Sequence, residues 1–134
     1  EIEKNIGFSK DFNVFEFRNA LGKKDKNKAY KIAYYFAENP KENPIVMTTS
    51  LVFSFFVQLL QYHGLKDKSS AASVLKINPY FIKDYEVAAK NYPMRKVSQI
   101  VAKLREIDVK SKGVGANGLK DVELYKELLI VIFA

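Results

Sequence analysis

The sequence predicts an all-α fold, a compact bundle of six to seven helices joined by short loops. Apolar residues recur three or four positions apart along nearly the whole chain. No segment shows the strict apolar and polar alternation that is typical of a half-buried strand. Glycine and proline stand between the periodic segments, at positions where they would end helices.

The first two helices are expected at residues 13–21 and about 25–38. In the first helix, Asn13 is the candidate N-cap and Gly22 the candidate residue just beyond the C-terminus. Proline at position 40 ends the second helix, because the residue before a proline avoids helical geometry. The buried stripe of the second helix is predicted to hold Ala29, Ile32, Ala33 and Phe36.

A third helix is expected at residues 45–63, with Asn43 as its cap and Pro44 at its first position. It contains no charged residue and is nearly as long as a membrane span. Its polar residues lie at spacings of four, four and three, so they share one face; they are Ser50, Ser54, Gln58 and Gln61. We therefore predict a central helix of a bundle and no membrane span. Its uncharged polar stripe is predicted to be a subunit interface.

The remaining helices are expected at residues 69–75, 79–90, 94–112 and 119–133. Ser69 or Ser70 is the candidate cap of the first of these, and Asn78 with Pro79 opens the next. The predicted core positions are Phe81, Ile82, Tyr85 and Ala89, then Val97, Ile100, Val101, Leu104 and Ile107, then Val122, Tyr125, Leu128 and Leu129.

Few residues could carry chemistry. There is no cysteine and one histidine, His63, so a metal site or a catalytic triad has no second imidazole and no thiol to use. We expect His63 to cap a helix or to lie at the surface. Residues 113–118 (GVGANG) match the dinucleotide-binding pattern GxGxxG, but a helix rather than a strand precedes them. We therefore expect a domain that is not an enzyme, with no metal, no cofactor and no small-molecule substrate.

The charge of the chain leaves a second function open. The net charge is +7, and basic residues are concentrated in the helix expected at 94–112. Arg95, Lys96, Lys103 and Lys110 are the candidate phosphate contacts, the three lysines forming a ridge at seven-residue spacing. The alternative function is thus a basic helical domain that binds nucleic acid, so DNA is a candidate partner. The same ridge also fits the solvated face of an amphipathic helix, which is the commoner case.

Four segments follow one another in a recognisable order. They are residues 12–21 (FNVFEFRNAL) with a charged turn after them, 43–62 opening on NPI, 72–90 with NPYFIK at 78–83, and 107–113 (IDVKSKG) before the last helix. In this order and spacing the chain resembles the C-terminal domain of the delta subunit of bacterial DNA polymerase III, a clamp-loader subunit. The likeness covers roughly residues 11–133.

This resemblance implies a helical collar domain, which holds the clamp-loader ring together during DNA replication in the cytoplasm. Its partners would be other loader subunits with homologous collar domains. The sliding clamp would be reached only through an N-terminal domain that is missing here. The parent complex would resemble a DNA polymerase holoenzyme, while the domain itself would not be catalytic. We accordingly expect residues 1–10 to be the tail of a preceding domain or a linker, and 11–134 to form the collar domain of a longer protein.

Overall fold

The computed structural model describes residues 12–113 and 120–134, and within these ranges it contains seven α-helices and no strand. The helices are α1 (Val14–Gly22), α2 (Lys26–Glu38), α3 (Ile45–Gly64), α4 (Ala71–Val74), α5 (Ile82–Asn91), α6 (Met94–Ser111) and α7 (Asp121–Phe133). Two 3₁₀ turns, η1 (Lys68–Ser70) and η2 (Pro79–Phe81), precede α4 and α5. The predicted all-α fold is confirmed. The prediction for residues 1–10 and most of the 113–118 loop lie outside the described residues.

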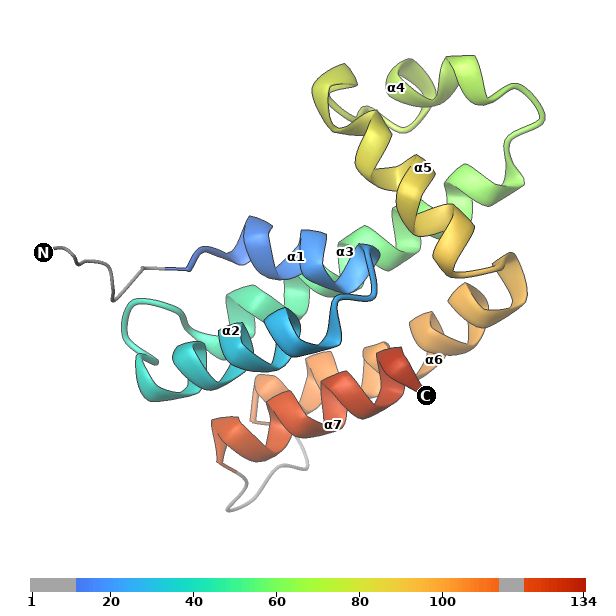
Figure 1. Cartoon of the computed structure of the whole chain (residues 1–134). Helices are drawn as coiled ribbons and strands as arrows, with labels where there is room; N and C mark the ends of the chain where they lie inside the picture. Colours follow the sequence, from blue (N-terminus) through green and yellow to red (C-terminus); the bar gives the residue numbers. More distant parts are fainter. Residues whose placement is uncertain (1–11, 114–119) are drawn as a thin grey trace, which may run out of the picture.

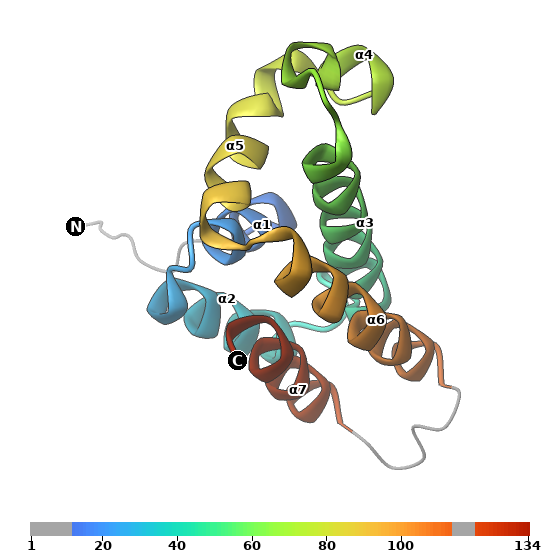
Figure 2. The same ribbon diagram turned by 90° about the vertical axis from the view of Figure 1, so that its right-hand side faces the viewer.

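Helix α3 packs against α1, α5 and α6, and its contact with α6 is the most extensive helix–helix contact of the fold. Helix α7 packs on α2 and α6, and α1 packs on α2, α3 and α5. Figures 1 and 2 show α4 at the far end of α5, away from the layer formed by α2 and α7. The fold therefore leaves part of α3 beside α1 and α5 without a further helix over it (Figure 2).

The core contains the apolar stripes that helical periodicity predicts. All four predicted positions of α2 are buried, as are four of the five in α6; Val101 is only partly buried. In α5 the buried positions are Tyr85 and Ala88, with Phe81, Ile82 and Ala89 packed at the edge. Aromatic rings join the layers, because Phe17 meets the edge of Phe36 at 5.7 Å between centroids. Each large apolar side chain buried in this way stabilises the fold by about 1.5–3 kcal/mol.

The ends of α1 confirm one expectation and correct another. The Asn13 side chain accepts a hydrogen bond from the Glu16 amide at 2.9 Å, as expected of an N-cap. Gly22, however, is the last helical residue, and the left-handed residue after the helix is Lys24, with φ of 56°. The Asp25 amide then bonds the Ala20 carbonyl at 2.9 Å and closes a Schellman motif. The prediction failed because a lysine stands where glycine is usual.

Of two other predicted caps, one is wrong and one is confirmed in position only. Pro44 has ψ of 133° and is the N-cap of α3, not its first helical residue, so Asn43 lies outside the helix. Ser70 is the N-cap residue of α4, one of the two predicted, but its side chain makes no capping hydrogen bond. The Asp67 side chain caps the preceding turn η1 by accepting from the Ser69 amide at 3.0 Å. The first prediction misses by one residue, and in the second a 3₁₀ turn with its own cap precedes the helix.

Candidate functional site

Helix α3 is the most unusual element of the structure. It contains no charged residue over 20 positions, and by length and composition it is the one helix in the described parts of the chain that could cross a membrane. Only 44% of its most apolar window is buried inside the fold. The buried positions are Ile45, Thr48, Thr49, Val52, Phe55, Phe56, Leu59 and Tyr62. The rest of an uncharged helix therefore faces outward or lines the gaps between its neighbours.

An open groove of about 420 Å³ runs along this outer face. Its lining comes from α1, α3 and α5 and consists of Arg18, Met47, Ser50, Leu51, Ser54, Phe55, Gln58 and Tyr85. The structure thus brings three of the four predicted interface residues together in one hollow. Gln61, the fourth, is exposed but is not among the lining residues. Met47 at the groove is 66% exposed, a large fraction for an apolar side chain.

Two of the predicted interface residues already have partners within the chain. Gln58 accepts a hydrogen bond from the Tyr85 hydroxyl at 2.8 Å, and burial raises the pKa of that hydroxyl. Ser50 donates to the Asp108 carboxylate on α6 at 3.3 Å. These bonds fix the two side chains before any partner arrives. Whether the stripe contacts another subunit stays a prediction.

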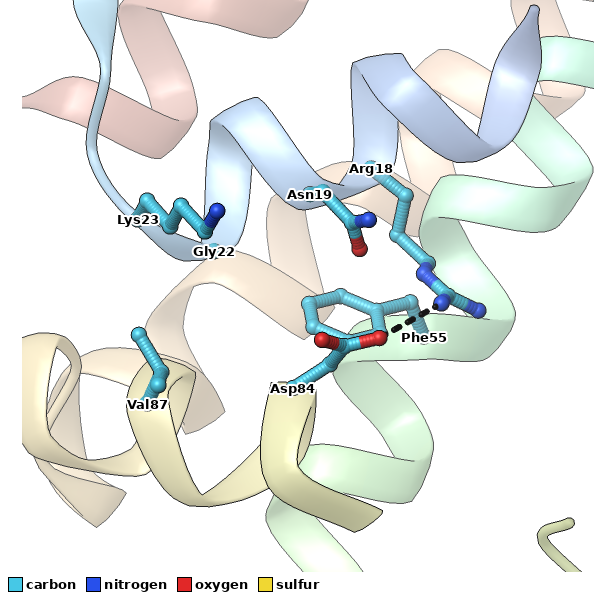
Figure 3. A pocket seen from close by; sticks show the side chains of 7 residues that line it. All are labelled: Arg18, Asn19, Gly22, Lys23, Phe55, Asp84 and Val87. Atoms are coloured by element: carbon cyan, nitrogen blue, oxygen red, sulfur yellow. Dashed lines mark hydrogen bonds and ion pairs between the residues drawn. The ribbon is translucent and has the colours of Figure 1, made fainter. Parts of the chain in front are cut away.

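Arg18 is the one charged residue of the groove lining, and the sequence analysis did not single it out. Only 7% of it is exposed, and Figure 3 shows its guanidinium group turned toward Asp84, with which it forms an ion pair at 3.3 Å. The guanidinium carbon also lies 5.2–5.5 Å from the ring centroids of Phe15, Phe55 and Phe81. The sequence did indicate that Arg18 is buried, because position 18 lies four residues after Val14 and three before Leu21, on the same face of the helix.

Asp108 holds the neighbouring helix pair together. Its side chain is only 17% exposed and accepts hydrogen bonds from Thr49 and Ser50 on α3. Lys112, one turn later, pairs with the same carboxylate at 3.0 Å. The carboxylate therefore links α6 to α3, which explains the aspartate and lysine in the 107–113 segment.

The predicted phosphate ridge does not form one uniform surface. Lys110 is paired with Glu127 of α7 at 3.2 Å, whereas Lys103 and Arg95 are exposed and Lys96 is half-buried. The ridge thus has a neutralised end near α7 and a basic end at the start of α6. Phosphate binding by these residues stays a prediction.

His63 has a structural contact instead of a catalytic one. Its Nε2 atom lies 2.8 Å from the Tyr92 carbonyl oxygen, so the imidazole joins the end of α3 to the turn between α5 and α6. In residues 12–113 and 120–134, no three His, Asp or Glu side chains gather in a way that could hold a metal ion.

Comparison with known proteins adds one match. The family model described as the DNA polymerase III delta subunit, C-terminal domain, matches residues 11–133. No curated protein and no solved structure matches the chain. The matched range covers every helix described above and has the all-α architecture that the family resemblance implied. The chain therefore belongs to the family of C-terminal domains of the DNA polymerase III delta subunit, a replication protein.

Proposed function

We propose that this chain is the subunit-assembly domain of the clamp-loader delta subunit, and that the groove along α3 packs against another loader subunit. Family membership implies association with other clamp-loader subunits. The observation that supports this groove as the contact is an uncharged helix face left open between α1 and α5. We place this non-catalytic role in the cytoplasm, where replication proteins act.

The composition of the groove suits the centre of a protein interface. Interface centres are depleted of charged residues and enriched in aromatic residues, methionine and arginine. The lining has Met47 in an exposed position, aromatic rings at Phe55 and Tyr85, and Arg18 as its one charged residue. Because Asp84 and three phenylalanine rings already hold the guanidinium group, docking would cost little further side-chain ordering.

A carboxylate placed in the groove tests this proposal. Ser54→Glu puts a charge at an exposed position of the groove lining. Burying an unpaired charge costs several kcal/mol, so we expect affinity for the remaining loader subunits to fall more than about tenfold. Ser98→Glu, at an exposed position of α6 outside the groove, is the matched control.

The readout is co-sedimentation of the 134-residue chain with the remaining loader subunits in an analytical ultracentrifuge. The wild-type chain and the Ser98→Glu variant should join the complex, while Ser54→Glu should sediment alone. A wild-type chain that fails to join would reject the assembly role. A folded Ser54→Glu variant that joins as well as the wild type would reject the groove while leaving the role itself intact.

A further inference from the structure

A cluster of cations, which we name the basic corner, forms where two turns of the chain meet. It consists of Lys23, Lys24 and Lys26 at the turn from α1 to α2, Lys90 at the end of α5, and Arg95 and Lys96 at the start of α6. Five of the six are exposed and Lys96 is half-buried. Asp25 is the one carboxylate within these stretches, and it caps α2 by accepting from the Lys28 amide.

Hydrogen bonds lock the two turns to one another. The Tyr92 hydroxyl donates to the Leu21 carbonyl at 2.6 Å, and the Asn91 side-chain amide donates to the Gly22 carbonyl at 2.9 Å. The Lys24 ammonium lies 4.7 Å from the centroid of the Tyr92 ring. Figures 1 and 2 both show the α1–α2 turn beside the end of α5. The cations of both turns therefore belong to one rigid surface.

The local sequence at this corner opposes helix stability. Helix N-termini favour acidic side chains, because the first backbone amides carry a partial positive charge. Helices α2 and α6 both begin here, neither has an acidic residue in its first turn, and both have cations there, Lys26 and Lys28 in α2 and Arg95 and Lys96 in α6. Among the other helices, α1, α5 and α7 have an acidic residue in the first turn, and α3 and α4 have no charged residue there.

The backbone conformation at the corner is also unfavourable at one lysine. Lys24 occupies the left-handed region, with φ of 56°, where glycine would cost less. Positive charge thus accumulates on two helix N-termini, which would be more stable without it, and on a turn where a lysine occupies a position that favours glycine. Such an arrangement is understandable if an anion supplies the missing negative charge.

We propose that the basic corner binds the phosphodiester backbone of a DNA strand. Cations spread over three chain segments suit a repeating polyanion, since each can meet a separate phosphate. A nucleic-acid partner is consistent with a family that acts in replication. The corner uses Arg95 and Lys96 of the predicted phosphate contacts but not Lys110, whose charge Glu127 neutralises.

The test is fluorescence anisotropy of a labelled single-stranded oligonucleotide titrated with the 134-residue chain over a range of potassium chloride concentrations. The corner variant is Lys24→Gln/Lys26→Gln/Arg95→Gln. The matched variant changes three exposed lysines elsewhere, Lys41→Gln/Lys76→Gln/Lys83→Gln, and so has the same net charge. Far-UV circular dichroism and urea unfolding confirm that both variants are folded.

The corner variant should bind at least about tenfold more weakly, and its slope of log K against log salt should be shallower by about 2, because each single-strand phosphate contact contributes about 0.7. The matched variant should keep most of the wild-type affinity and slope. Equal losses in the two variants, or no binding by the wild type, would overturn the proposal. So would competition by poly-glutamate as strong as that by unlabelled oligonucleotide, since the surface would then suit an acidic polypeptide.

Discussion

Tyr92 connects the basic corner to the core, and replacing it with phenylalanine removes one hydroxyl group without changing the packing volume. The side chain is fully buried, and its ring meets the edge of Phe56 at 5.4 Å between centroids. Its hydroxyl bonds the Leu21 carbonyl, which also accepts from the Lys24 amide at 3.1 Å and so is not left without a donor. We therefore expect Tyr92→Phe to lower the free energy of unfolding by about 1 kcal/mol at neutral pH.

At high pH the sign of this difference changes. Burial raises the pKa of Tyr92 well above its usual value of 10.0 and raises the pKa of Tyr125 to about 12. A group with a raised folded-state pKa contributes stability that is complete below the unfolded pKa and is lost as pH rises toward the folded pKa. Above about pH 10 the wild type thus loses about 1.4 kcal/mol per pH unit from Tyr92, and Tyr92→Phe does not.

The two stability curves should therefore cross near about pH 11. Urea unfolding followed by circular dichroism, at pH values from about 7 to about 11, measures both curves, and lysine titration affects them equally. Tyr80→Phe is the control, because that ring is 83% exposed and should change neither stability nor its pH dependence. If the curves for wild type and Tyr92→Phe stay parallel over the whole range, the Tyr92 hydroxyl is not buried and does not form the hydrogen bond to the Leu21 carbonyl.

Two further substitutions, each with a control variant, test a helix contact and a left-handed turn. Asp108→Ala should lower the free energy of unfolding by about 1–2 kcal/mol, because the carboxylate links α6 to α3 and to Lys112; Glu106→Ala, an exposed neighbour, should change it by less than about 0.5 kcal/mol. Urea midpoints measure both, and equal effects would contradict the link. Lys76→Gly should stabilise the chain by about 1 kcal/mol, since Lys76 has φ of 57°, whereas Lys83→Gly inside α5 should destabilise it by about as much. A thermal melt that shows both glycine variants weakened would argue against the left-handed turn.

Helix positions and buried faces could be read from the sequence, because the three- and four-residue spacing is a local property. The stripes of α2 and α6 and the Asn13 cap follow from neighbours within a few turns. Cap positions were less predictable. Lys24 and Lys76 have left-handed backbone conformations, which glycine adopts more readily. Gly22 was therefore predicted to be the residue just beyond the C-terminus of α1, a position that Lys24 occupies.

The contacts that define the candidate surfaces depend on pairs of residues far apart in the chain. Arg18 and Asp84 are 66 positions apart, Thr49 and Asp108 are 59 apart, and the Tyr92 hydroxyl reaches Leu21 across 71. No periodicity encodes such pairs, because they exist only once α3 has packed against α1, α5 and α6. By itself the sequence determined an all-helical family member with an uncharged central helix. Only the tertiary packing decided which part of that helix stays open as a groove, and which lysines meet at one corner while others are neutralised.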